Sequence, residues 1–312
     1  MSAITLLEAM KQAQGRGEML EAGVYATYLE SQLFQYLKFQ EIPGNSLSFL
    51  QEDVLGMATF RAINEGYATS YSKTHRVTEV LSIMGGDIDV DVATVNMTPG
   101  IDIRASEVTS KIRAMSMNAQ EAVIKSSVAD DPKAFNGLQV RLTGSQLIAA
   151  GSTSGGDALS LFKLDQAIKA VVNPTAIICN TTMSIRLSQA SRNTSVGGFI
   201  TYGQDEFGKQ LTMYNGLPIV EMRENSIGDD ILPFDEAAPA GGTAQCTSIY
   251  VVSLAEDGVV MLQNGKMRVR DLGELNDMPV FRTRIEWYTA LAMKRRRCAS
   301  RIWGITNATV AV

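Results

Sequence analysis

The sequence predicts an α+β protein whose first hundred residues extend away from a compact body. Three observations predict this class: an apolar helical pattern followed by a β-rich segment, a long amphipathic helix after residue 100, and mixed helices and strands beyond residue 150. The chain has 312 residues, of which 45% are hydrophobic and 20% charged. This is the composition of a globular protein that is long enough to bury a substantial core.

The N-terminal segment has the pattern of an amphipathic helix. Its apolar side chains at Tyr25, Leu29, Leu33 and Leu37 fall on one helical face. The helix is expected to end at Pro43-Gly44. Because the next sixty residues offer no compact partner, we expect residues 1–42 to form an arm and these four side chains to lie at an assembly interface.

Residues 43–97 are predicted to form an extended β-hairpin. They are rich in β-formers, and the clearest extended runs are Val77 to Met84 and Ile88 to Val95, on either side of Gly85-Gly86. An isolated two-stranded ribbon is marginally stable in water, so this one is expected to rest on a neighbouring surface of the same chain or of another subunit. The charged residues expected at assembly contacts in this ribbon are Arg61, His75, Arg76, Asp87 and Asp89.

A long helix is predicted over Ile103 to Val128. Its apolar residues recur at offsets of four and three, and Asp131-Pro132 follows as a stop signal. Twenty-six helical residues would span roughly 39 Å. The segment is therefore predicted to form a long helix with a single buried apolar face.

The rest of the chain alternates helices and strands. A helix is expected around Leu161 to Val171, and a hairpin around Asn215-Gly216, the dipeptide preferred in type I′ turns. The other expected elements are a strand over Ala176 to Cys179, a short helix containing Met183 and Leu187, strands over Thr247 to Arg270 and long strands over Val280 to Ile305.

The sequence contains few of the residue combinations and motifs that catalysis requires. His75 is the only histidine, and Cys179, Cys246 and Cys298 are far apart in sequence and expected to be buried thiols. Gly203 to Gln210 has the glycine and lysine spacing of a phosphate-binding loop, but Gln210 replaces the hydroxyl that would bind magnesium. We therefore expect no enzyme activity, no cofactor and no metal, with a soluble nucleotide-binding enzyme as the least favoured alternative.

Charged clusters favour protein contacts over nucleic-acid recognition. The net charge of −5 argues against affinity gained by neutralising phosphates, although contact with confined nucleic acid remains compatible with it. Asp87, Asp89 and Asp91 would share one face of a strand, which favours a solvated face over a cation site. If Lys294 to Arg301 were a strand, Arg295 and Arg297 would share a face and serve interface or structural ion pairs.

No targeting or membrane segment is expected. No stretch approaches the roughly 18 uninterrupted apolar residues of a membrane span, and the N-terminus lacks the basic start of a secretory signal. We therefore expect synthesis in a cytoplasm and no membrane partner.

Taken in order, the predicted elements resemble the major capsid protein of tailed bacteriophages, the Hong Kong ninety-seven type fold. The resemblance covers nearly the whole chain. Its local correspondences are Phe135-Asn136-Gly137-Leu138, the strand and helix over Ala176 to Leu187, the segment Tyr214 to Val220, and the terminal segments Arg284 to Trp287 and Arg301 to Ile305. The resemblance implies an arm over 1–42, an extended loop over 43–97, a peripheral domain with a spine helix over 98–141, an axial domain over 142–272 and peripheral return strands over 273–312.

The resemblance also implies a function and partners. It implies a shell subunit that assembles with itself into the pentamers and hexamers of an icosahedral phage head enclosing double-stranded DNA. It further implies a portal protein, separate scaffolding and decoration proteins as further partners, location in the virion capsid, and assembly in the bacterial host cytoplasm. The alternative within this fold is the shell of a cellular nanocompartment, an encapsulin.

Overall fold

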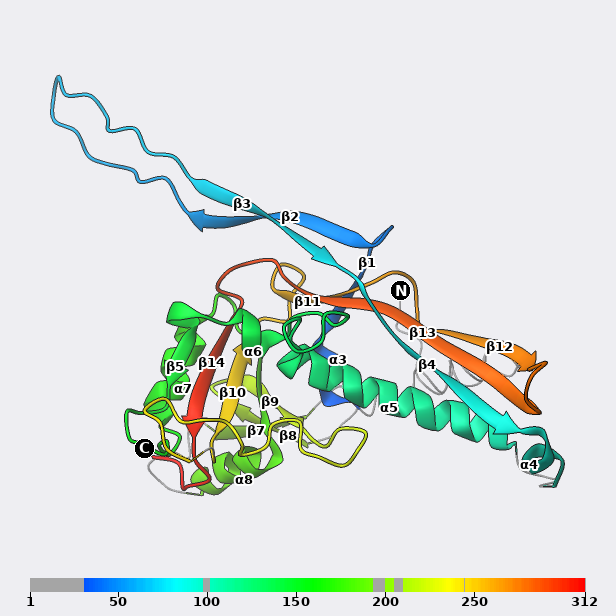
Figure 1. Ribbon diagram of the computed structural model, residues 1–312. Helices are drawn as coiled ribbons and strands as arrows, with labels where there is room; N and C mark the ends of the chain where they lie inside the picture. The colour runs from blue at the N-terminus through cyan, green and yellow to red at the C-terminus, as the bar shows by residue number, and fades with distance from the viewer. Residues whose placement is uncertain (1–30, 98–101, 193–199, 205–209, 244, 312) are drawn as a thin grey trace.

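The fold is organised around one long helix, α5 (Ile103–Lys125), which lies against a five-stranded sheet (Figure 1). Asp102 caps its first turn by accepting a hydrogen bond from the amide of Ala105 at 3.1 Å. The buried side chains include Val108, Ile112 and Ala119 and form one stripe, as the spacing predicted. The predicted helix is confirmed, although it ends three residues before Val128.

This computed structural model describes residues 31–97, 102–192, 200–204, 210–243 and 245–311. Beside α5, the helices are α3 (Gln32–Tyr36), α4 (Val92–Met97), α6 (Leu138–Arg141), α7 (Leu161–Ala170), α8 (Thr181–Ala190) and the 3-10 turn η1 (Gly144–Gln146). The strands are β1 (Lys38–Glu41), β2 (Ser46–Val54), β3 (Lys73–Val80), β4 (Ser82–Asp91), β5 (Leu147–Ala149), β6 (Ala176–Asn180), β7 (Ile200–Gln204), β8 (Gln210–Tyr214), β9 (Leu217–Met222), β10 (Thr247–Val252), β11 (Val259–Gln263), β12 (Arg268–Glu274), β13 (Val280–Met293) and β14 (Ala299–Ile305). No helix in these ranges is long and apolar enough to span a membrane.

The five-stranded sheet is assembled on β13. This 14-residue strand pairs antiparallel with β11 at its C-terminal end, with β12 at its N-terminal end, and with β4 over Val280 to Thr289. Strand β1 adds to β11 in parallel. Segments that are distant in the sequence are therefore joined in one sheet.

The second sheet has seven strands in the order β5-β14-β10-β6-β9-β8-β7. Its central strands are buried on both faces: Ile178 contributes to the core shared with α5, and its neighbour Ile177 contributes to the core beneath α7 and α8. The predicted elements over Leu161 to Met222 are confirmed. Asn215 and Gly216 have φ values of 49° and 78°, as a type I′ turn requires.

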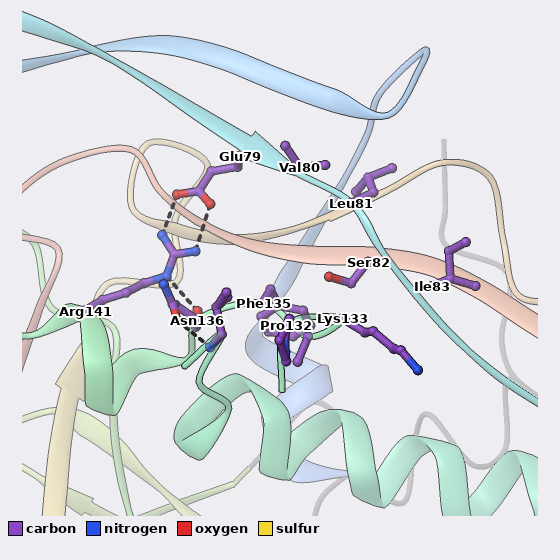
Figure 2. Close-up of a pocket in the computed structure, with 12 residues that line it drawn as sticks. Glu79, Val80, Leu81, Ser82, Ile83, Pro132, Lys133, Phe135, Asn136 and Arg141 are labelled. Atoms are coloured by element: carbon purple, nitrogen blue, oxygen red, sulfur yellow. Dashed lines mark hydrogen bonds and ion pairs between the residues drawn. The ribbon is translucent and has the colours of Figure 1, made fainter. Parts of the chain in front are cut away.

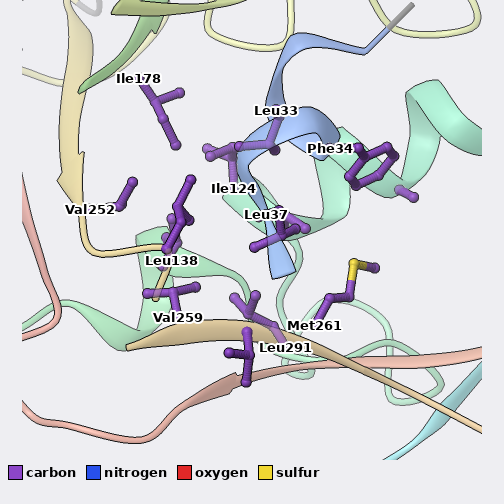
Figure 3. Close-up of a cluster of buried hydrophobic side chains, with 14 of the residues drawn as sticks. Leu33, Phe34, Leu37, Ile124, Leu138, Ile178, Val252, Val259, Met261 and Leu291 are labelled. Atoms are coloured by element: carbon purple, nitrogen blue, oxygen red, sulfur yellow. The ribbon is translucent and has the colours of Figure 1, made fainter. Parts of the chain in front are cut away.

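The N-terminal prediction needs correction. The helix ends at Tyr36, and residues 38–41 form β1 in the sheet. Leu33 and Leu37 are buried in the chain's own core, where Figure 3 shows them beside Ile124, Leu138 and Leu291. Residues 31–42 thus complete the body of the protein, and Leu33 and Leu37 are not available to another subunit here. Tyr25 and Leu29 lie outside the described residues.

The extended hairpin expected over residues 43–97 is present, but only β2 and β3 form it. Strand β3 pairs with β2, and the ribbon that they form projects from the body (Figure 1). Gly85 and Gly86 lie in the middle of β4, where a Cβ at Gly85 would overlap the carbonyl oxygen of Ile285. Residues 92–97 form α4, whose first turn is capped by Asp91 through the amide of Ala93 at 2.7 Å. The strand-forming pattern of β4 was predicted correctly, but its partner, β13, lies far along the sequence.

Sheet membership also departs from the expected domain boundaries. Strand β11 and most of β12, which fall within the expected axial segment 142–272, lie in the sheet with β13. Strand β14, which falls within the expected peripheral segment 273–312, lies in the seven-stranded sheet. The chain therefore crosses between the two sheets before β11 and again in the turn after β13.

Candidate assembly surfaces

The ribbon exposes apolar side chains that have no cover within the described chain. On β2 and in the tip, residues 55–72, the exposed large side chains are Leu50, Val54, Leu55, Met57, Phe60, Ile63, Tyr67 and Tyr71. Soluble monomers rarely expose apolar side chains so densely, and such a patch marks an interaction site. The exposed apolar surface of the ribbon is therefore typical of a protein–protein interface.

The end of the ribbon is held by its own hydrogen bonds. The Glu65 carboxylate accepts from the amide of Ala62 at 3.0 Å, and the Glu65 amide donates to the Ala62 carbonyl at 3.3 Å. Arg61 donates to the Glu65 carbonyl at 3.2 Å and lies 5.0 Å from the ring centroid of Tyr67. Arg61, expected at an assembly contact, therefore organises the turn that presents its neighbours Phe60 and Ile63.

Arg141 ties the base of the ribbon to the body (Figure 2). Its two Nη atoms bind both carboxylate oxygens of Glu79 on β3, the second at 2.8 Å. Its Nε donates to the carbonyl of Asn136 at 2.7 Å, and Nη2 also donates to the carbonyl of Leu291 at 3.0 Å. One mostly buried guanidinium thus joins the ribbon, the loop after α5 and β13.

A pocket of about 530 Å³ opens beside this ion pair. One wall is the strand segment from Glu79 to Ile83, and the other is the loop from Pro132 to Asn136, as Figure 2 shows. Phe135 is almost fully buried, whereas Val80 and Ile83 are exposed at the rim. Apolar and polar side chains line the pocket in similar measure, and the Glu79–Arg141 pair is among them.

The other charged ribbon residues make weaker contacts. His75 Nδ1 and Asp53 Oδ2 are 2.8 Å apart across the two strands, and Arg296 lies 4.0 Å from the other Asp53 oxygen. Arg76 is exposed on β3. His75 lies beside a shallow cavity of about 410 Å³, but no nucleophile among the described residues is hydrogen-bonded to it.

Asp87 and Asp89 are paired within the chain. Arg284 donates to both oxygens of Asp87 at 2.7 and 2.8 Å, and Arg282 donates to both oxygens of Asp89 at 2.6 Å. These hydrogen bonds hold the pKa of each carboxyl below its usual value. The pairs are exposed on the five-stranded sheet. Their role in subunit contacts stays a prediction.

The basic cluster lies in a turn, not on a strand, so the predicted alternation of Arg295 and Arg297 was wrong. Arg295 pairs with Asp257, and Arg297 Nε donates to the carbonyl of Ala170 at 3.0 Å. Arg301, on β14, is buried and reaches Glu236 at 2.8 Å. The cluster therefore serves structural pairing inside the chain.

The remaining candidate sites lack the required geometry. Gly203 and Gln210 lie on the antiparallel strands β7 and β8, whereas a phosphate-binding loop leads into a helix; the residues between Gln204 and Gln210 lie outside the description. Within the described ranges, no group of three His, Cys, Asp or Glu side chains could hold a metal ion. The three cysteines are buried and free, and burial raises the pKa of the Cys298 thiol to about 12.

Sequence reasoning missed the Glu79–Arg141 pair and the apolar end of the ribbon. Glu79 and Arg141 are 62 residues apart, and no local pattern connects them. Phe60 and Ile63 carried a usable signal, because they are large apolar residues in a segment with little strand alternation. Tyr67 and Tyr71 extend the same signal.

The chain is similar to one family of capsid proteins and to several solved structures. The model of the family described as major capsid protein GP7 matches residues 52–165. No curated protein matches the sequence. Among solved structures, the chain is similar to the holo-SrpI encapsulin complex from Synechococcus elongatus PCC 7942, with a TM-score of 0.67, 15% identity, and coverage of 90% of this chain and 89% of that one.

Two further solved structures give similar values. The capsid of the native GTA particle matches with a TM-score of 0.64 and 10% identity over 89% of this chain and 90% of that one. A structure from Mycobacterium phage Cain matches with a TM-score of 0.60 and 13% identity over 100% of this chain and 99% of that one. At these identities the likeness shows the fold, and the fold expected from the sequence is confirmed.

Proposed function

We propose that the chain is a capsid protein of the Hong Kong ninety-seven type, which its fold and the match of residues 52–165 to the family model support, and that copies of it form the pentamers and hexamers of an icosahedral phage head. The shell encloses double-stranded DNA and is the location of the protein in the virion. Its role is structural, without catalysis, and the proposed site of assembly is the cytoplasm of the bacterial host.

The observation that best supports this proposal is that the apolar side chains of the ribbon are incompletely covered. Among the described strands, β2 and β3 pair only with each other, and the exposed apolar side chains continue from β2 to the tip. A two-stranded ribbon of this kind gains little stability alone. Contacts with adjacent copies complete it, and obligate interfaces of this class bury more than about 2,000 Å².

The charge of the chain fits a container for DNA better than a DNA-binding protein. Because each chain has a net charge of −5, the shell would release few counterions from the DNA phosphates. It would therefore enclose the genome without binding it tightly. A separate motor acting through a portal protein would then drive packaging. Separate scaffolding and decoration proteins are the other proposed partners.

Electron microscopy of the chain expressed in bacteria, alone and with candidate helper proteins, tests the proposal. The expected result is closed shells with five-fold and six-fold capsomers, which contain nuclease-protected DNA when packaging proteins are present. Shells that contain one specific folded protein and no DNA would support the nanocompartment alternative. A chain that remains monomeric under all these conditions contradicts both.

A catalytic alternative depends on Lys209 or His75. A nucleotide-binding enzyme would lose an assayable activity on substitution of Lys209 or His75. The proposed shell protein has no such activity to lose.

A further inference from the structure

We propose that strand β4 forms a two-fold contact, in which its open edge pairs antiparallel with the β4 edge of a second copy and the symmetry axis passes through Gly85. The inference rests on the proposed shell function, because a shell built from rings also needs contacts that join one ring to the next. It assigns one such contact to a strand edge and joins two five-stranded sheets into one.

One edge of β4 has no partner in the described chain. The Val92 amide donates to the Pro279 carbonyl at 3.0 Å, and this bond continues the register in which Asp91 opposes Val280. Because hydrogen-bonded and non-hydrogen-bonded pairs alternate in an antiparallel ladder, the even-numbered residues of β4 bond to β13. The odd-numbered residues therefore point their N–H and C=O groups away from β13, and no backbone group of the described chain bonds to them. These residues are Ile83, Gly85, Asp87, Asp89 and Asp91.

This edge also lacks the usual protection of an exposed strand. Edge strands are generally kept from pairing by short length, by lysine or proline, or by bulges. Strand β4 has ten residues in unbroken register, contains no proline or lysine, and exposes all of its odd-numbered residues. Strand β12, on the other side of β13, has a register shift between Asp271 and Gly273. Of these two edges, β4 is therefore the one suited to accept another strand.

The charges beside β4 favour a second copy in antiparallel orientation. Lys133 lies at the N-terminal end of the strand, in the pocket that residues 79–83 also line. Asp89 and Asp91 lie at the C-terminal end. In the described part of the chain, neither the Lys133 ammonium nor the Asp91 carboxylate has an oppositely charged side chain within 4.0 Å. A two-fold axis brings the basic end of each strand beside the acidic end of the other, and such complementarity favours association.

Charge also selects the register of the pairing. With the axis at Gly85, Ile83 of each copy lies opposite Asp87 of the other, and no side chain lies at the axis. With the axis at Asp87, two carboxylates would lie directly opposite each other, which is destabilising. The chosen register forms about six backbone hydrogen bonds between the two copies. It also places both α5 helices on the same face of the joined sheet, so neither helix obstructs the other face.

Chemical cross-linking tests the contact and its symmetry. Ile83→Cys and Asp87→Cys are combined in one chain, and a short bifunctional thiol reagent is applied to assembled shells and to unassembled subunits. Opposed residues of a hydrogen-bonded pair have Cα atoms about 5.5 Å apart, whereas the two positions are roughly 13 Å apart within one strand. The native thiols are buried. On a denaturing gel we expect covalent dimers without larger multimers, because a two-fold contact closes on itself.

The register control combines Ile83→Cys with Asp91→Cys, two positions that would be opposed only with the axis at Asp87. This pair is expected to give few dimers. Larger multimers from the first pair, shells that give no dimers, or equal dimers from the control overturn the two-fold assignment alone. Wild-type chains that form no shells contradict the proposed function, and dimers trapped from such chains would still support this contact.

A proline substitution provides the second readout. Ile83→Pro removes an N–H that faces the open edge, so the ladder with β13 keeps its bonds. Each two-fold contact then loses two hydrogen bonds, and the concentration needed for assembly should rise by on the order of tenfold or more. Ile83→Ala keeps the N–H and should change that concentration by less than about threefold. Circular dichroism checks that both variants are folded, and equal effects of the two would contradict the assignment.

Discussion

The hairpin β8–β9 and the ribbon β2–β3 are both antiparallel strand pairs, yet they differ in what covers them. Strand β9 continues into a seven-stranded sheet, and Tyr214 and Val220 are almost fully buried. The ribbon has no further strand of the described chain beside it, and Leu50 remains 70% exposed. Local strand-forming patterns are similar in the two, but only the first is completed by its own chain.

The comparison separates the apolar burial that stabilises the folded subunit from the apolar burial that drives assembly. Burial around the seven-stranded sheet stabilises the folded subunit, because those apolar atoms leave water when the chain folds. Apolar atoms on the ribbon leave water only when copies meet. Substitutions in the sheet should therefore act on unfolding, and substitutions on the ribbon should act on assembly.

The largest expected effect comes from the sheet. Ile178→Ala on β6 should lower the free energy of unfolding of the unassembled subunit by about 4 kcal/mol, because it removes a fully buried side chain and leaves a cavity. Leu50→Ala on the ribbon should lower it by less than about 0.5 kcal/mol and should instead reduce assembly. Denaturant unfolding and light scattering measure the two quantities. Equal losses of unfolding free energy would remove the distinction.

A somewhat smaller effect is expected at the buried ion pair. Arg301 binds Glu236 at 2.8 Å and Ser248 at 2.9 Å, and the Arg301 and Glu236 side chains are about nine-tenths buried. Arg301→Ala leaves the Glu236 carboxylate buried without its cation, so we expect a loss of about 3 kcal/mol in unfolding free energy.

Arg296→Ala provides the matched control for that prediction. Arg296 is exposed and lies 4.0 Å from Asp53 on the ribbon, so its loss should cost less than about 1 kcal/mol. Thermal or denaturant unfolding of both variants compares them. A larger loss for Arg296 would place structural energy in the contact between the ribbon and the body.

The sequence predicted best where the structure is local. The periods of α5 and α7, and the Asn215-Gly216 turn, depend on neighbouring residues and were confirmed. The partner of β4 is about 200 residues away on β13, and Gly85 allows the two strands to approach closely. Nothing within the segment identifies that partner.

The candidate surfaces divide in the same way. Asp87 and Asp89 were recognised as one face of a strand, but their partners Arg284 and Arg282 depend on long-range register. Leu33 and Leu37 had the correct apolar pattern, yet the space that they fill is created by α5 and β11 far along the chain. A pattern can identify an apolar face without revealing which surface covers it.

A moderate effect is expected at the base of the ribbon. Glu79→Gln removes the charge that Arg141 binds, and the loss should be about 1–2 kcal/mol in local stability, since both side chains are mostly buried. Hydrogen exchange at the amides of β3 should become faster while exchange in β6 stays unchanged. Glu52→Gln, an exposed residue of β2, is the control and should leave both rates unchanged. Faster exchange throughout the protein would mean that the pair supports the whole body rather than the ribbon.

The smallest expected effect concerns acid stability and the two exposed aspartate pairs. Because Arg284 and Arg282 lower the pKa of Asp87 and Asp89 in the folded state, each pair stabilises the fold above the pKa of the unfolded chain. That contribution disappears as the pH falls through the lower folded pKa, so it belongs to the region below about pH 4. Asp87→Asn with Asp89→Asn should make the stability of the unassembled subunit less steeply dependent on pH there. Circular dichroism during acid titration measures this slope, and Glu52→Gln should retain the wild-type curve. An unchanged slope in the double variant would show that the pairs are too well solvated to contribute, and it would leave the sheet face that carries them free to act between subunits.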